Sequence, residues 1–318
     1  MGGNRTASQS DRGLSRRSLL RRVVPWGIGL PVAGGLAAGS VYGAGAWLRG
    51  WGRVLPPRWQ MPLEPPIVGA HRGGAALFPE HTLAAYVSSY EQFGSRFMEL
   101  DVHVSRDGVP VLIHDGTVDR TTDGSGRVAA QSLAGLQRLD AGYRFRGLDG
   151  VSWAGRGLRI PTLLEALKRL PDCVFSVEIK QGLDDREAAA VVAAVRLAGM
   201  ERRVLLGSAS QATYLRIQGA APDIPSFYSF RSGALLLIAV WLGLARWYRP
   251  AHNALLIPQR LFGLDYLSPH VLRTARDLGL PVLVWTVNEA AEMERLLRLG
   301  VDGIITDRPD LLARLLRR

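Results

Sequence analysis

Residues 97–115 read FMELDVHVSRDGVPVLIHD and predict two β-strands joined by a tight turn. The first strand, Phe97–His103, alternates strictly, so that Glu99 and Asp101 point to one face and the intervening apolar residues to the other. The Arg-Asp-Gly sequence that follows is typical of a turn, so Val109–His114 is expected to return beside the first strand as a hairpin. Two carboxylates buried on one face repel each other, and a cation between them removes that cost.

The same alternation occurs in the segment Val174–Lys180, where Glu178 and Lys180 share one face. Glu99, Asp101 and Glu178 would then offer carboxylate oxygens from two strands, which is a donor set that suits one divalent cation, Mg²⁺ or Ca²⁺. The alternative is the solvated polar face of an edge strand, and the pattern alone leaves it open.

Strand-like and helix-like segments alternate along the whole chain from Ile67. Further strands are predicted at Ile67–Ala70, Val204–Ser208, Ile224–Phe230, Ala254–Pro258, Pro281–Val287 and Gly303–Asp307. Helices are predicted at Thr82–Phe93, Leu163–Leu170, Asp185–Ala198, Gln211–Gly219, Pro269–Leu278, Ala290–Leu299 and Pro309–Leu316. Without the hairpin arm, eight strands remain, the number of an α/β (β/α)₈ TIM barrel, although an open doubly wound sheet is the alternative.

Two histidines follow predicted strands, His71 after the first and His114 after the hairpin arm. A histidine can give or take a proton near neutral pH, although one at a strand end is more often a surface or structural residue. Arg72 and Lys180 add positive charge suited to phosphate oxygens. From the residues alone, these groups indicate metal-assisted hydrolysis of a phosphate ester.

Composition and charge exclude several classes of protein. The 318 residues include a single cysteine, Cys173, so an intrachain disulfide and a cysteine-based metal cluster are both impossible. The net charge is +11, but residues 1–60 carry nine arginines against one acid and so account for +8 of it. The nearly neutral remainder, without aromatic residues interleaved among basic runs, argues against a nucleic-acid partner.

The amino-terminal residues 1–48 predict an export signal or a membrane anchor. Arg16 and Arg17 precede an uncharged run, residues 23–48, in a pattern that resembles a bacterial twin-arginine signal, and Ala44-Gly45-Ala46 has the form of a cleavage site. A proline-rich linker is predicted at 49–66, before a folded domain at 67–318. The catalytic domain is therefore expected outside the cytoplasm, exported across the cytoplasmic membrane or anchored to it.

Further motifs follow one another from about Ile67 to the carboxyl terminus. They are His71-Arg72-Gly73-Gly74, Pro79-Glu80-His81-Thr82, Glu99-Leu100-Asp101-Val102, Asp107–Asp115, Asp119-Arg120-Thr121-Thr122, Ile160-Pro161-Thr162-Leu163, Val177-Glu178-Ile179-Lys180, Val284–Asn288 and Asp302–Pro309. In kind, order and spacing they resemble the motifs of glycerophosphodiester phosphodiesterases. The resemblance covers the whole predicted domain.

This resemblance implies a (β/α)₈ barrel with a small insertion, at about residues 115–160, over its mouth. It implies roles for three groups of residues: Glu99, Asp101 and Glu178 as metal ligands, His71 and His114 as general acid and base, and Arg72, Lys180 and Trp285 as substrate-binding residues. Glu80 and His81 would support the site. His81 stands where the family usually has asparagine; its imidazole is expected to cap the next helix or to contact a substrate oxygen.

The activity that the resemblance implies is hydrolysis of glycerophosphodiesters to glycerol 3-phosphate and an alcohol. The first alternative is a lysophospholipase D that acts on membrane lysophospholipids. A further alternative is an inactive, membrane-tethered binding module, although each histidine, carboxylate and cation that the chemistry needs is present in the sequence.

One apolar segment, Gly233–Leu244, stands out from the other helices, and residues 233–248 are a second candidate for membrane contact. The segment is too short to span a bilayer and too apolar for an ordinary surface helix. It predicts either a buried helix of the barrel or an interfacial helix, with Trp241, Trp247 and nearby arginines at the level of the lipid headgroups.

Overall fold

The structure is a computed structural model of the chain, and the residues that it describes are 59–180, 182–227, 230–260 and 265–317. They belong to one compact unit, Trp47–Arg318. The predicted signal or anchor at 1–48 and most of the predicted linker at 49–66 lie outside the described residues. Within the described part of the chain, no helix combines the length and hydrophobicity needed to cross a membrane.

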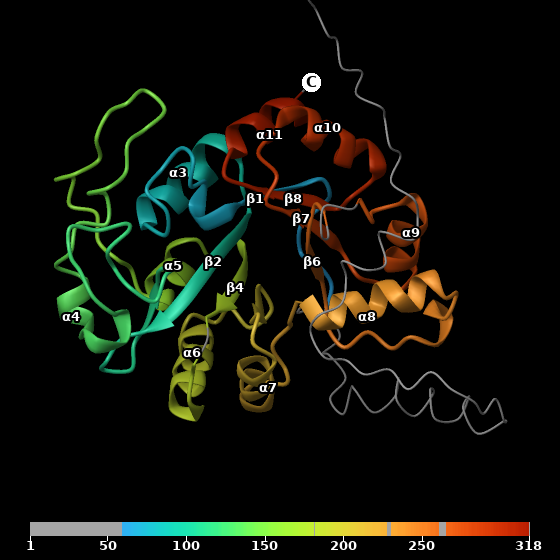
Figure 1. Cartoon of the computed structure of the whole chain (residues 1–318), viewed down its shortest axis with the longest axis horizontal. Helices are drawn as coiled ribbons and strands as arrows, with labels where there is room; N and C mark the ends of the chain where they lie inside the picture. The colour runs from blue at the N-terminus through green and yellow to red at the C-terminus, as the bar shows by residue number, and fades with distance from the viewer. Residues whose placement is uncertain (1–58, 181, 228–229, 261–264, 318) are drawn as a thin grey trace, which may run out of the picture. The chain divides into compact units, whose positions relative to one another are not determined.

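Eight short strands lie at the centre of the unit, with helices around them (Figure 1). The strands are β1 (Ile67–Ala70), β2 (Phe97–Val104), β3 (Pro110–Leu112), β4 (Val174–Ile179), β5 (Val204–Gly207), β6 (Leu255–Pro258), β7 (Val282–Trp285) and β8 (Gly303–Thr306). The arm β3 is antiparallel to β2, as the turn sequence predicts. The others pair in parallel along the path β5-β4-β2-β1-β8-β7-β6, which confirms the predicted α/β fold.

Residues 224–227 form no regular strand, although a strand is predicted at Ile224–Phe230, and Phe230 already belongs to a helix; residues 228–229 lie outside the described part of the chain. Ser226 makes one parallel bridge to Leu206 of β5, and Phe227 makes one to Ala254, immediately before β6. The proline between positions 224 and 226 has no N–H to donate, which limits regular pairing. The prediction of a full strand is wrong here, but the two bridges connect β5 to β6 in the strand order of a barrel.

The longer helices follow the strands, and seven predicted helices begin and end within one residue of their predicted limits, whereas the helix predicted at Gly233–Leu244 begins and ends three residues earlier. The helices are α3 (Leu83–Phe93), α4 (Leu133–Leu136), α5 (Leu163–Arg169), α6 (Asp185–Leu197), α7 (Gln211–Ala220), α8 (Phe230–Trp241), α9 (Pro269–Asp277), α10 (Ala290–Leu299) and α11 (Pro309–Leu316). In six of these helices the residue before the first turn accepts a hydrogen bond from that turn through its side chain: Thr82, Ser132, Thr162, Asp184, Ser210 and Ser268. These caps explain why the helix starts are visible in the sequence.

An apolar cluster fills the space enclosed by the strands. It takes one side chain from each of seven parallel strands: Ile67, Phe97, Val174, Leu205, Leu256, Leu283 and Ile305. In β2 and β4 these are the first residues of the strand, and the acids follow further along the same strands. The polar side chains therefore lie toward the carboxyl-terminal ends of the strands, where barrel enzymes carry their active sites.

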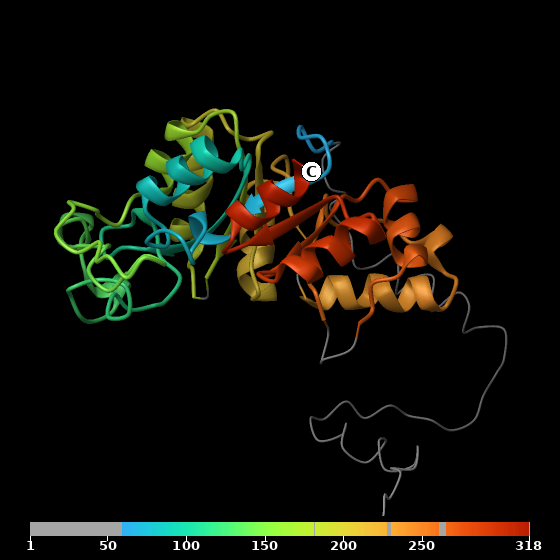
Figure 2. The ribbon, with the colours of Figure 1, turned by 90° about the horizontal axis from the view of Figure 1, so that it is seen from above.

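Residues 113–162, between β3 and α5, form a lobe at one side of the strands (the green segment in Figures 1 and 2). The lobe contains α4 and a 3₁₀ turn, η2 (Val128–Ala130), and its small core is built from buried apolar residues such as Val118 and Leu136. Arg120, in this lobe, binds Glu80, which follows β1.

Candidate active site

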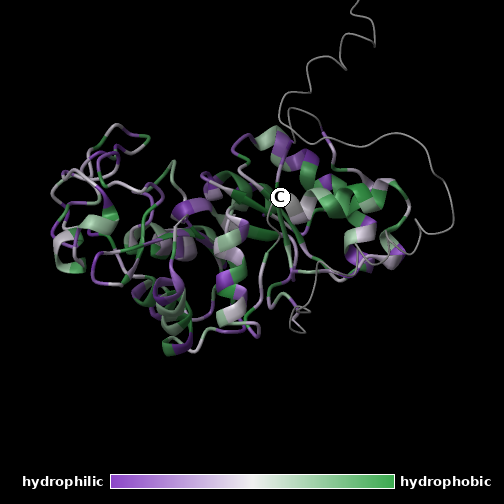
Figure 3. Ribbon diagram, turned by 60° about the horizontal axis from the view of Figure 1, so that its bottom comes forward, coloured by the Kyte–Doolittle hydropathy of each residue, from purple (hydrophilic) through white to green (hydrophobic). Residues whose placement is uncertain are grey.

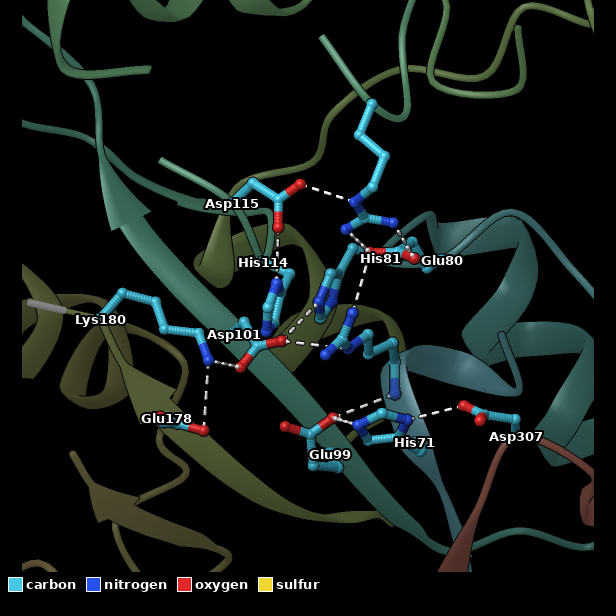
Figure 4. Close-up of polar contacts among 12 residues, drawn as sticks. His71, Glu80, His81, Glu99, Asp101, His114, Asp115, Glu178, Lys180 and Asp307 are labelled. Carbon is cyan, nitrogen blue, oxygen red and sulfur yellow. Dashed lines mark hydrogen bonds and ion pairs between the residues drawn. The ribbon is translucent and has the colours of Figure 1, made fainter. Parts of the chain in front are cut away.

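A cavity of about 340 Å³ lies at the carboxyl-terminal ends of the strands. Eight predicted site residues line it: His71, Arg72, Glu99, Asp101, His114, Glu178, Lys180 and Trp285. Glu80 and His81, predicted as supporting residues, are not in its wall and lie behind it. Figure 4 shows how the polar members of this set face one another.

Three acids from β2 and β4 converge on the cavity. The parallel register pairs Asp101 with Glu178 and Glu99 with Ser176, so that all four side chains are on the inner side of the sheet. One carboxylate oxygen each from Glu99, Asp101 and Glu178 lies within 4.8 Å of the others. The alternation read in the sequence thus produces the cluster that it predicts.

Asp101 is buried and bound by Lys180 and His81. Lys180 Nζ lies 2.8 Å from its Oδ1 and 3.3 Å from Glu178 Oε2, while His81 Nε2 donates to Oδ2 at 3.0 Å. Burial alone would raise the pKa of Asp101, but the hydrogen bond from His81 and the charge of Lys180 hold the pKa well below its usual range. Asp101 is therefore ionised at neutral pH.

Glu99 has a different environment from its neighbour. Burial, followed by the charge of Asp101, raises the pKa of Glu99 to about 8, although the positive charge of His71 and a hydrogen bond of 3.0 Å from the Arg72 backbone N–H act in the opposite direction. Asp101 is thus ionised, whereas Glu99, buried beside that negative charge, is hard to ionise. A cation bound between them would correct this.

His71 is oriented by a carboxylate from the far end of the chain. Its Nδ1 donates to Asp307 Oδ1 at 2.6 Å, and the other oxygen of Asp307 accepts from Asn288 Nδ2 at 2.7 Å. Burial lowers the pKa of His71, but Glu99 and Asp307 outweigh it, so the net shift is upward. The Nε2 atom, 3.9 Å from Glu99 Oε2, is left for chemistry in the cavity.

His114 is oriented in the same way from the other side of the cavity. Its Nδ1 donates to Asp115 Oδ1 at 2.7 Å, and Asp115 Oδ2 accepts from Arg120 Nε at 2.6 Å. Arg120 then binds both oxygens of Glu80 at 2.8 Å, and Glu80 lies 3.4 Å from Arg72 Nη1. A continuous chain of charges therefore links His114 to Arg72.

Arg120 dominates the electrostatics of that chain. Its hydrogen bond lowers the pKa of Asp115 to about 2. Burial tends to raise the pKa of Glu80, but the paired hydrogen bonds from Arg120 overcome this and lower it to about 2. Both acids are thus fixed as carboxylates.

The structure also brings in residues to which the sequence analysis gave no role. Asp307 and Asn288 orient His71, while Asp115 and Arg120 orient His114. Two signals were present in the sequence: an aspartate immediately after His114, and another immediately after β8, at the end where barrel sites form. Neither signal shows which histidine the aspartate contacts, because the partner of Asp307 is 236 positions away.

His81 does not cap the next helix, which is one of the two contacts expected for it. Thr82 Oγ1 caps α3 by accepting from Ala85 N at 3.1 Å, and His81 is buried outside the cavity wall. Its Nε2 donates to Asp101, its Nδ1 accepts from Tyr86 OH at 2.8 Å, and burial lowers its pKa. A neutral imidazole with one donor and one acceptor satisfies both partners, so His81 acts from behind the site.

The other side of the cavity is apolar. Its wall there consists of Phe227, Leu237, Leu256, Ile257, Pro258, Tyr266, Trp285 and Ile305. Trp285, at the end of β7, is 43% exposed and marks the rim, whereas most of the others are buried. The cavity therefore offers a charged half to a phosphate and an apolar half to whatever is attached to it.

A parallel α/β fold with such a cavity at its strand ends is typical of barrel enzymes. Comparison with known proteins identifies the family. Residues 71–311 match the model of the glycerophosphoryl diester phosphodiesterase family. A glycerophosphodiester phosphodiesterase of Caldanaerobacter subterraneus subsp. tengcongensis is 34% identical over 79% of this chain and 98% of its own length. One of Bacillus subtilis is 30% identical over 76% and 83%.

The chain belongs to the glycerophosphodiester phosphodiesterase family, and it is a hydrolase, as the resemblance predicts. Solved structures agree. A glycerophosphodiester phosphodiesterase of Agrobacterium tumefaciens has a TM-score of 0.62 at 29% identity and covers 81% of this chain and all of its own. A phosphodiesterase of Oleispira antarctica, solved with the product sn-glycerol-3-phosphate, has a TM-score of 0.63 at 27% identity over 80% and 97%.

Glu80 should make stability depend on acid pH. Its pKa is about 2 in the folded chain against an ordinary value of 4.5, so its contribution is complete above pH 4.5 and is lost as the pH falls from there toward 2. The pKa difference corresponds to a stabilisation of at most about 3 kcal/mol. Glu80→Gln should therefore be less stable than the parent at pH 7, and the difference should shrink below pH 4.5 in urea unfolding.

The exposed Glu91→Gln, on α3, is a control for removing one negative charge. A deficit of Glu80→Gln that stays constant from pH 7 to pH 3 would contradict the pairing with Arg120.

Proposed function

We propose that this enzyme hydrolyses glycerophosphodiesters to glycerol 3-phosphate and an alcohol, with two histidines as acid and base beside one divalent cation. The convergence of Glu99, Asp101 and Glu178 on the cavity that His71 and His114 also line carries the proposal. The names of the relatives support the substrate class, and the Oleispira antarctica phosphodiesterase binds the expected phosphate product.

The donor set fits a hard cation such as Mg²⁺ or Ca²⁺. Glu99, Asp101 and Glu178 offer only oxygen atoms, and burial beside the charge of Asp101 raises the pKa of Glu99, a cost that a bound cation would remove. These three residues would hold the ion. When bound, a divalent cation would withdraw negative charge from the phosphodiester as a Lewis acid.

Arg72 and Lys180 would bind the phosphate oxygens. Arg72 Nε is buried and has no hydrogen-bond acceptor among the described residues; Asp101 Oδ2, at 3.4 Å, forms an ion pair with it but not a hydrogen bond. A buried donor of this kind is normally satisfied, and a phosphate oxygen in the cavity would satisfy it. Trp285 would contact the alcohol or glycerol portion at the rim.

The two histidines would carry the protons. Each commits Nδ1 to an aspartate, so Nε2 is the atom that exchanges a proton with the substrate. One histidine takes a proton from the nucleophile, either water or the 2-hydroxyl of the glycerol by way of a cyclic phosphate, as oxygen attacks phosphorus. The other protonates the leaving alcohol as the phosphorus–oxygen bond breaks. Overall one water is consumed, and its oxygen remains on phosphorus.

Removal of divalent cations should abolish hydrolysis of glycerophosphocholine. Without the cation, the charge of the three acids would be offset only by Arg72 and Lys180 and would repel the anionic diester. A coupled assay for glycerol 3-phosphate should show loss of activity in excess chelator and recovery when Mg²⁺ or Ca²⁺ is added. Full activity in chelator, after dialysis against it, would contradict the metal site.

His114→Ala should reduce turnover by about 10²–10⁴-fold, the usual share of one general acid or base. The substitution leaves Glu99, Asp101 and Glu178 in place, so calorimetric uptake of the cation and the thermal unfolding midpoint should remain those of the parent. Exposed Leu197→Ala, on α6, is the control. Unchanged turnover in His114→Ala would remove this histidine from the mechanism.

We also propose that the chain is exported or anchored by its amino-terminal residues, on the strength of Arg16, Arg17 and the uncharged run at 23–48. Changing both arginines to lysine should leave the protein in the cytoplasm of a bacterial host, as measured by fractionation. The matched change of Arg21 and Arg22 to lysine should not. Equal export of both variants would contradict the twin-arginine route.

A further inference from the structure

Helix α8 forms part of the cavity wall and part of the outer surface of the enzyme. Gly233, Ala234 and Leu237, in its first two turns, line the cavity. Leu236 and Val240 are buried in the cluster that includes β6 and α9. Figure 1 shows α8 running away from the strands, and the hydropathy colouring of Figure 3 shows that most of the helix is hydrophobic.

An apolar stripe runs along α8 from the cavity to the surface. Ile238, Trp241 and Leu242 follow Ala234 at intervals of four, seven and eight residues, which places them on one side; Leu242 comes directly after the last residue of α8, and its N–H donates to Ile238 O at 3.0 Å. Their side chains are 47%, 63% and 66% exposed. Large exposed apolar residues that adjoin one another usually mark a contact surface, and this one begins inside the cavity at Ala234.

The segment after α8 adds residues typical of a membrane interface. In the 3₁₀ turn η3 (Ala245–Trp247), Trp247 is 56% exposed, and the guanidinium carbon of Arg246 lies 3.8 Å from the centre of its ring. Tryptophan and arginine together suit the headgroup region of a lipid bilayer. We refer to Ile238, Trp241, Leu242, Arg246 and Trp247 as the α8–η3 surface.

The charge of this region complements anionic headgroups. Residues 224–264 contain four arginines and no acidic residue. Three of them, Arg246, Arg249 and Arg260, are exposed. Cationic residues near an anionic lipid surface are attracted to its headgroups.

The apolar half of the cavity indicates what kind of substrate enters it. Glycerol is small and carries hydroxyl groups, so it does not require a wall of eight mainly aliphatic and aromatic side chains. Such a wall suits a hydrocarbon portion of the diester, because burial of that portion releases water from apolar surface on both sides. The stripe on α8 leads from this wall to the solvent.

We propose that the α8–η3 surface rests on an anionic lipid surface and lets phosphodiesters with a hydrocarbon chain enter the apolar half of the cavity. This inference rests on the proposed hydrolysis and names the kind of substrate that the same site takes. A protein partner on the stripe would cover the end that lies in the cavity, whereas a lipid surface presents its own diesters there.

The test compares two substrates on the full-length chain: soluble glycerophosphocholine, and lysophosphatidylcholine in vesicles containing phosphatidylglycerol. The variant combines Ile238→Ser, Trp241→Ser and Leu242→Ser, all outside the cavity wall. It should lose about tenfold or more in rate on the vesicle substrate, because three apolar anchors are removed. Its rate on glycerophosphocholine should stay within about twofold of the parent rate, well below the tenfold loss expected on the vesicle substrate.

The control combines Leu197→Ser and Leu215→Ser, two exposed leucines on α6 and α7 with 68% and 56% exposure, and should lose neither activity. A second variant, Arg246→Ser with Arg249→Ser, should bind phosphatidylglycerol vesicles less well in sedimentation while its binding to pure phosphatidylcholine vesicles is unchanged. Thermal unfolding checks that each variant is folded.

Three outcomes would overturn the inference: equal losses on both substrates, no loss on either, or a change of oligomeric state by light scattering while vesicle hydrolysis is unaffected. The last would identify the surface as an interface between copies of the chain. If the parent hydrolyses neither substrate, the proposed hydrolysis itself fails, and that result is distinct from all three.

Discussion

The parallel register between β2 and β4 is the constraint on which the site depends. Six consecutive pairs, from Phe97–Val174 to Val102–Ile179, place Asp101 beside Glu178 with both side chains on the inner face. A slip of one residue would turn the acids outward and the apolar residues inward. The buried apolar faces on both sides of these strands therefore fix the position of the carboxylates, although no acid contributes to the packing.

Charge pairing then sets the geometry around the acids. His71 Nδ1 is bound to Asp307, directly after β8, and His114 Nδ1 is bound to the neighbouring Asp115. Arg120 joins the second pair to Glu80 and so ties the lobe at 113–162 to the residues that follow β1. Because these parts come from distant segments, the active site is complete only when the whole unit has folded.

Much of the fold and the three acids of the site could be predicted from the sequence, because the patterns that indicate them are local. Period-two alternation identified the inward acids on β2 and β4, and side-chain caps such as Thr82 marked the helix starts. The rest depends on contacts between distant segments. Asp307 reaches His71 only through the pairing of β1 with β8, and His81 is buried between Tyr86 and Asp101, which its motif does not reveal. The residues around Ser226 were predicted as a strand because the hydrophobic pattern does not register that Pro225 has no backbone N–H to donate.

The most direct test of the account is to locate the cation. A crystal of the enzyme grown with Mn²⁺, a stand-in that gives an anomalous signal, should show one peak bounded by Glu99, Asp101 and Glu178, at about 2.0–2.6 Å from an oxygen of each, the range for hard divalent ions. A peak elsewhere, or density in which these three carboxylates bind only Lys180 at saturating Mn²⁺, would contradict it.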